Sequence, residues 1–193
     1  ISLLTGCSGG SSKERPRQST DYLGLEDGAI LVFHSDTFDI DNTPQETQET
    51  ITMRVNSYQP GIFKISFEST DDPDVDGQFI EKDGNNYYDR GEWEVDSDTP
   101  SNTRGAIIIT NPISESFTSE TWGACQGKVS VTVPAGTFEA WKFYKKVNRN
   151  ETDFTEVSLW FVPYIGYVKV SETDWEGETK TWNGESELTS YSF

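Results

Sequence analysis

Three aspartates alternate in one short stretch of the chain, and a glycine follows directly after the third. The stretch reads DPDVDGQFIEKD and covers residues 72–83. Calcium takes six to eight oxygen ligands, which proteins supply as carboxylates and carbonyls around a tight turn. Alternating aspartates before a glycine bring such oxygens together within a few residues. The stretch therefore predicts a calcium site, and Ca²⁺ is the one cofactor that we expect.

The spacing resembles the order of ligands in an EF-hand loop. Asp72, Asp74 and Asp76 would supply the first carboxylates, and Gln78 would supply its backbone carbonyl. Asp83 falls where a glutamate normally closes the loop, and its shorter side chain favours a weaker site or a smaller ion. The flanking residues predict strands instead of the helices of an EF-hand. An acidic turn between two strands is the alternative interpretation.

Other residues that could carry out chemistry are few. The chain has one histidine, His34, and two cysteines, Cys7 and Cys125, and it contains no G-x-S-x-G, H-E-x-x-H or C-x-x-C motif. A nucleophilic thiol needs a neighbouring base or positive charge. His34 could help Cys125 only if folding brought the two together, so we expect a structural histidine and a buried, inert thiol. We therefore predict that the protein is not an enzyme.

The beginning of the chain points to a lipid anchor. It reads ISLLTGCSGGSS, with a leucine and two small residues before Cys7. This pattern resembles the lipobox of bacterial lipoproteins, in which the cysteine becomes the new N-terminus and receives acyl chains. The resemblance implies that residues 1–6 are the remnant of a signal peptide and that residues 7–20 are a lipidated cysteine with a flexible tether. Two or three acyl chains anchor a protein durably to a membrane.

The residue after the cysteine bears on which membrane holds the anchor. An aspartate there would favour retention in the inner membrane of enteric bacteria, but this chain has Ser8. The resemblance therefore favours the outer membrane of a cell envelope.

Composition excludes some classes of protein and partner. The length of 193 residues suits one domain, which we place at residues 21–193 and expect to be monomeric. There are 33 acidic against 15 basic residues, a net charge of -18 that repels phosphate backbones and argues against nucleic acid as a partner. Aromatic residues make up 13% of the chain, which argues against disorder. No apolar run is long enough to span a membrane as a helix.

Apolar and polar residues alternate along several short segments. A period of two with one polar face is typical of strands in a sheet that exposes one face to solvent. No segment shows a convincing helical period. We predict an all-β antiparallel meander of about ten strands, which must curl because flat sheets of that size are rare. The preferred form is a strongly curved sheet or half-barrel with an apolar concave face. The segments are 29–34, 51–55, 63–67, 106–110, 129–133, 138–147, 154–162, 165–170 and 187–193.

One hairpin has a sequence distinctive enough to suggest a family. Pro134 and Gly136 suit the corners of a tight turn between two alternating segments. The motif V-x-V-P-A-G-T-F at residues 131–138, together with WFVPYIGYV at residues 160–168, resembles a group of bacterial envelope proteins of unassigned function, many of them lipoproteins. The resemblance implies a curved antiparallel sheet similar to the half-barrels of periplasmic lipoprotein carriers. It implies no established activity.

These observations predict a lipid-anchored, non-catalytic domain of the cell envelope. Its membrane contact would be the acyl chains on Cys7. An apolar small molecule or an envelope protein would bind on the concave face of the sheet, because ligand sites are usually apolar and concave. The sequence does not identify the residues of such a groove. The alternative is a structural or adhesive module stabilised by calcium at Asp72–Asp83.

Overall fold

The computed structural model describes residues 16–38, 44–71, 76–93 and 99–193, and these form one antiparallel sheet of twelve strands. The described residues contain no helix, so none that could cross a membrane. The prediction of an all-β, strongly curved antiparallel sheet is confirmed. The strands are β1 (Ile30–Phe38), β2 (Pro44–Gln59), β3 (Ile62–Ser69), β4 (Asp76–Asp83), β5 (Asn86–Trp93), β6 (Ile107–Thr110), β7 (Thr118–Ser119), β8 (Gly123–Val133), β9 (Gly136–Asn148), β10 (Asp153–Val162), β11 (Gly166–Glu176) and β12 (Thr179–Ser192).

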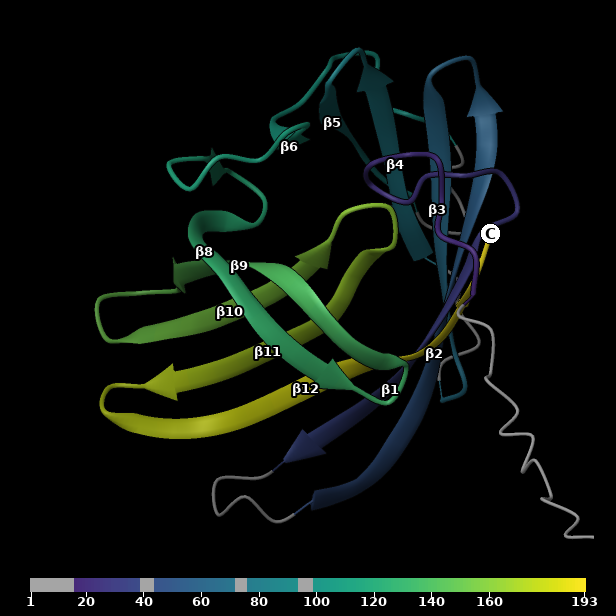
Figure 1. The fold of residues 1–193 in the computed structure, drawn as a ribbon. Coiled ribbons are helices and arrows are strands. Elements are labelled where there is room, and N and C mark those ends of the chain that lie inside the picture. Colours follow the sequence, from purple (N-terminus) through teal and green to yellow (C-terminus); the bar gives the residue numbers. More distant parts are fainter. Residues whose placement is uncertain (1–15, 39–43, 72–75, 94–98) are drawn as a thin grey trace, which may run out of the picture.

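The order of the strands shows how the sheet curls. It is β6-β5-β4-β3-β2-β1-β12-β11-β10-β9-β8-β7, so two six-strand meanders are joined where β1 pairs with β12. The sheet bends into a nearly closed barrel (Figure 1). Its two edge strands, β6 and β7, meet at a seam. The hydroxyl of Ser119, which is 1% exposed, donates across this seam to the carbonyl oxygen of Ile107 at 3.4 Å.

The interior of the barrel is filled by the apolar side chains that the alternating pattern directs inward. In β1, Leu31 and Phe33 are buried, whereas His34 lies on the opposite face. Both meanders contribute to one continuous core, in which Phe33 stacks on Tyr167 with ring centroids 5.3 Å apart. Burying each large apolar side chain contributes about 1.5–3 kcal/mol. The strand residues buried in this core are Leu31, Phe33, Met53, Val55, Ile65, Ile80, Tyr87, Ile108, Ile109, Val131, Val133, Ala140, Phe143, Leu159, Phe161, Val162, Val168 and Leu188.

Residues 16–29, here called the cap, cross one end of the barrel before β1 begins. The Ser19 amide donates to the carbonyl of Tyr164, and the Tyr164 amide donates to the carbonyl of Tyr22, both at 2.9 Å. Gly24 has a φ of +81°, and a Cβ atom there would lie 2.5 Å from the carbonyl oxygen of Ile165. The cap therefore packs directly on the turn between β10 and β11. Its first residues, 16–20, belong to the stretch that the sequence assigned to the tether.

A buried carboxylate ties the cap to the opposite wall of the barrel. Asp21 is 6% exposed, and its Oδ1 accepts the amides of Leu23 and Leu25 at 2.9 and 3.1 Å. Its Oδ2 accepts the ammonium of Lys82 at 2.6 Å and the hydroxyl of Tyr87 at 3.0 Å. Burial, and then the charge of Asp21, raise the pKa of Tyr87, so its hydroxyl stays a donor. The carboxylate thus joins the cap to β4 and β5.

We predict that Asp21→Ala destabilises the protein severely. The substitution leaves the hydroxyl of Tyr87, which is 1% exposed, and two cap amides without their acceptor. Each buried polar group left unpaired costs about 1–3 kcal/mol, so we expect a loss of about 3 kcal/mol, which lowers the melting temperature of a domain this size by roughly 6–12 °C. Thermal unfolding followed by circular dichroism measures the change.

The exposed turn residue Asp71 is a matched control. Asp71→Ala removes the same side chain from the surface and should change the stability by no more than about 0.5 kcal/mol. Equal melting temperatures for the Asp21→Ala and Asp71→Ala proteins would contradict the role assigned to the buried carboxylate.

Candidate functional site

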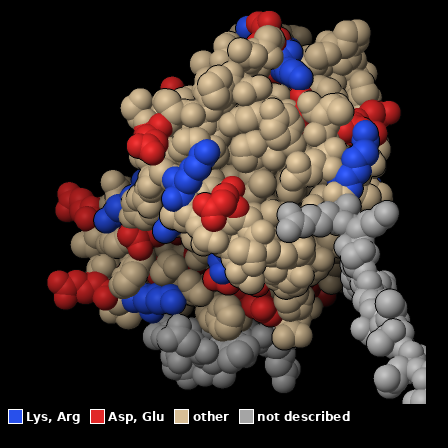
Figure 2. Space-filling view, in the orientation of Figure 1, with Lys and Arg blue, Asp and Glu red and all other residues tan. Residues whose placement is uncertain are grey.

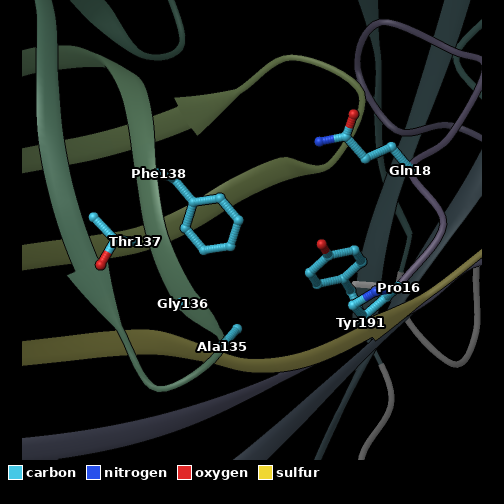
Figure 3. A pocket seen from close by; sticks show the side chains of 7 residues that line it. All are labelled: Pro16, Gln18, Ala135, Gly136, Thr137, Phe138 and Tyr191. Atoms are coloured by element: carbon cyan, nitrogen blue, oxygen red, sulfur yellow. The ribbon is translucent and has the colours of Figure 1, made fainter. Parts of the chain in front are cut away.

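A cleft of about 700 Å³ opens at the capped end of the barrel. It lies between the tip of the β8–β9 hairpin, the start of the cap and the end of β12 (Figure 3). Small-molecule sites in proteins typically have volumes of about 300–1,000 Å³, so the cleft is large enough for a ligand. We call it the hairpin cleft. The residues that line it are Pro16, Gln18, Ala135, Gly136, Thr137, Phe138 and Tyr191.

The cleft exists because β11 and β12 separate at this end of the barrel. Their pairing ends with Lys169 opposite Glu187, whereas β12 continues alongside β1 to Ser192. The hairpin tip approaches β12 beyond this point, and the Ala135 amide donates to the carbonyl of Leu188 at 2.9 Å. The pairing of β1 with β12 shifts by one residue here. The tip is therefore fixed to β12 by a main-chain bond at a local irregularity.

The hairpin itself forms where the sequence predicted it. The two strands pair from Val133 opposite Gly136 back to Ala124 opposite Tyr144, with a bulge between Cys125 and Lys128. Figure 1 shows the hairpin crossing over β10–β12. The buried side chains of Val131, Val133 and Ala140 join the common core, whereas Ser130, Thr132 and Thr137 are exposed. The alternation in the sequence predicted the strands but carried no signal for the bend that brings the tip to β12.

The described residues that line the cleft come from three separate elements. Phe138 from the hairpin and Tyr191 from β12 approach the cavity from opposite sides, and Gln18 reaches in from the cap (Figure 3). None of the seven lining residues is an acid, a base, a histidine or a cysteine. General acid–base catalysis near neutral pH uses such groups, and metal ions bind to them. The hairpin cleft thus offers two aromatic rings and a few neutral polar groups.

The interior of the barrel, in contrast, has little free space. A cavity of about 60 Å³ lies among core residues of both meanders, including Met53, Ile80 and Tyr167. A water molecule occupies about 30 Å³ of liquid, so this space suits a water or two and no larger ligand. The Tyr167 hydroxyl donates to the sulfur of Met53 at 3.1 Å, and burial raises the pKa of Tyr167. Large core side chains, among them Phe33, Phe143 and Phe161, lie on this concave side, and a ligand on the concave face stays a prediction.

His34 and Cys125 lie on opposite sides of the sheet. His34 is on the outer face of β1, where its Nε2 lies 3.3 Å from a carboxylate oxygen of Asp36. Cys125 packs against the interior core from β8, and its amide donates to the carbonyl of Phe117 at 3.0 Å. The structure therefore does not bring a base to the thiol.

The residues of the predicted calcium site do not converge in the described part of the chain. Asp72 and Asp74 lie outside the described residues, as does Cys7. Asp76 and Asp83 are the two ends of the extended strand β4, about 23 Å apart at roughly 3.3 Å per residue. Gln78 lies within that strand, in register with Ile65 of β3 and Glu92 of β5.

Arginine side chains neutralise the carboxylates at the end of β4. Arg104 donates to Asp83 at 2.9 Å and also pairs with Glu81, which bonds to Arg90 at 2.6 Å as well. Hydrogen bonds from Arg104 and then Arg90 lower the pKa of Glu81. Across the ranges that the structure covers, no three acidic, histidine or cysteine side chains gather in a way that could hold a metal ion. A calcium site that uses Asp72 and Asp74 stays a prediction, and Asp83 is not placed to complete it.

Comparison with known proteins supports the fold but identifies no family. No family model and no curated protein matches the chain. The structure is similar to a crystal structure of a protein from Bacteroides fragilis NCTC 9343 described as exported and as having a YmcC-like fold. The TM-score is 0.54 at 13% sequence identity, over 90% of this chain and 99% of that chain. A protein from Parabacteroides distasonis ATCC 8503 described as a lipoprotein aligns with a TM-score of 0.46 at 13% identity, over 91% of this chain and 100% of that chain.

We predict that calcium, if it binds at residues 72–76, raises the melting temperature of the protein. A ligand that binds only the native state at a hundredfold excess over its Kd stabilises by about 2.7 kcal/mol, or roughly 5–10 °C here. The comparison is between unfolding in EDTA and unfolding in millimolar calcium.

Two variants locate the effect. Asp74→Asn should abolish the shift, whereas Asp83→Asn should keep it, because Asp83 lies at the far end of β4. The same melting temperature with and without calcium would favour the alternative interpretation, in which the stretch is an acidic turn that binds no calcium.

Proposed function

We propose that the protein is a lipid-anchored, non-catalytic domain of the bacterial cell envelope that binds an uncharged ligand in the hairpin cleft. The observation that carries this proposal is the cleft itself, which has a ligand-sized volume and a lining without acid, base or thiol. We place the site at the rim of the barrel because the cavity of about 60 Å³ among core residues such as Met53 and Tyr167 is much smaller.

The location rests on the sequence around Cys7. The lipobox-like run before this cysteine supports acylation, and acyl chains would hold the domain at a membrane surface. The similar structure from Bacteroides fragilis is described as an exported protein, which agrees with a place in the envelope. We propose the outer membrane as the anchoring membrane, because Ser8 follows the cysteine instead of aspartate.

The first test of this proposal is Cys7→Ala in the full chain with its own leader, expressed in the native host or in a related bacterium. The unchanged chain should be found in the membrane fraction and should incorporate radiolabelled palmitate. The variant has no thiol to accept the diacylglycerol, so it should lose the label and leave the membrane fraction.

Cys125→Ala is the matched control, because Cys125 lies in β8 against the core and is the chain's other cysteine. That variant should keep the label and the location. Labelling that survives Cys7→Ala would disprove the lipid anchor.

A further inference from the structure

We propose that the hairpin cleft binds a neutral oligosaccharide, with a sugar ring packed between Phe138 and Tyr191. This inference rests on the proposed function, because it names the ligand class of the same cleft. The charge, the aromatic rings and the polar groups of the lining each restrict the chemical class of the ligand.

None of the described residues that line the cleft is charged, in a chain where a quarter of the residues are charged. The chain has 25% Asp, Glu, Lys and Arg and a net charge of -18, yet none of the seven lining residues is ionised at neutral pH. Figure 2 shows a mostly uncharged area in the upper middle of the face seen in Figure 1, bordered by acidic and basic side chains at the centre and below. A charged ligand would lose its hydration in the cleft without gaining an opposite charge. The described lining therefore favours a neutral ligand.

Two aromatic rings approach the cavity from separate elements. Phe138 comes from β9 and Tyr191 from β12, and both are partly exposed and packed against the core from the rim. The faces of aromatic rings carry partial negative charge and attract the positive edges of groups that lie against them. A pyranose ring presents such a surface, because its axial C–H bonds lie on one face and are polarised by the ring oxygens. The pair of rings thus suits a flat, neutral ring.

The polar groups of the cleft suit a ligand with many hydroxyls. Gln18 offers an amide that both donates and accepts, and the hydroxyl of Thr137 does the same. Thr137 already shares a hydrogen bond with Thr132 at 3.0 Å, which orients its oxygen. Sugar hydroxyls also donate and accept, so they match this set.

Two other neutral ligands fit the lining less well. An acyl chain would cover the amide of Gln18 without giving it a partner, and an unpaired polar group costs about 1–3 kcal/mol. An extended peptide that added a strand at the hairpin tip would need free main-chain groups there. The Ala135 amide is already used by the carbonyl of Leu188, at 2.9 Å.

The test is a titration of the ¹⁵N-labelled full chain carrying Cys7→Ala, followed by NMR. The probes are cellohexaose, maltohexaose and hexa-N-acetylchitohexaose as neutral saccharides, hexagalacturonate as an acidic one, the neutral ester glycerol monolaurate (called laurate below) as an acyl chain and a neutral decapeptide. The readout is the shift of the amide signals of Gly136 and Thr137, which report on the cleft directly. At least one neutral hexasaccharide should move both signals, and hexagalacturonate should not.

Variants of the lining separate ring packing from hydrogen bonding. Phe138→Ala should weaken the binding at least tenfold, and Phe138→Tyr should restore it, because the ring returns. Thr137→Val keeps the volume and loses one hydrogen bond, so the Kd should rise about three- to tenfold. Ser130→Ala, on the exposed face of the same hairpin but outside the cleft, is the matched control and should bind as the parent does.

The outcomes distinguish this inference from the function on which it rests. If laurate or the decapeptide moves the Gly136 and Thr137 signals and no saccharide does, the sugar is wrong and the cleft remains a binding site. If none of the probes moves them, both proposals fail. Saccharide binding that is unchanged by Phe138→Ala and Thr137→Val would overturn the placement in the cleft.

Discussion

The closure of the barrel depends on one buried carboxylate. Between the two edge strands, the Ser119 hydroxyl makes a 3.4 Å contact with a carbonyl of β6, so the seam alone holds the edges weakly. Asp21 provides a stronger link, because it joins the cap to Lys82 of β4 and to Tyr87 of β5. Two main-chain bonds join the same cap to Tyr164 in the β10–β11 turn. Opposite walls of the curved sheet are thereby held together across its end.

The hairpin cleft is a consequence of this closure. The cap occupies the middle of the barrel end, so the β8–β9 hairpin, which extends beyond the last residues of β10, bends toward β12 at the rim. It meets β12 where β11 has already separated from it, and Ala135 bonds to Leu188 there. The gap left between the hairpin tip, Pro16 and Tyr191 is the cleft. Rigid main-chain contacts on both sides of a site hold its lining residues in place without help from a ligand.

The period-two pattern was enough to predict the class of fold, because each strand buries one face and the burial follows the alternation. The cap was not predicted, since the sequence between Pro16 and Ala29 has no such period and several of its bonds are to distant residues, such as that from Lys82 to Asp21. The segment Asp76–Asp83 was interpreted as part of a metal loop, because its spacing matched a ligand pattern. In the structure its residues pair with β3 and β5, so long-range pairing outweighed the local motif. The hairpin was predicted from Pro134 and Gly136, but its contact with Leu188 has no local signature.

The packing of the interior decides where this fold can bind a ligand. A curved sheet resembling lipoprotein-carrier half-barrels suggests a ligand held against the concave face. Here large side chains from both meanders, among them Phe33, Phe143 and Phe161, fill that space. Opening a ligand-sized cavity would mean removing several of these contacts, each worth about 1.5–3 kcal/mol, from a domain whose total stability is of order 5–15 kcal/mol. A site at the rim requires no such loss of buried contacts, because Phe138 and Tyr191 are already partly exposed there. The same sheet can thus retain its packed core and still present a cleft at the end that the cap and the β8–β9 hairpin close.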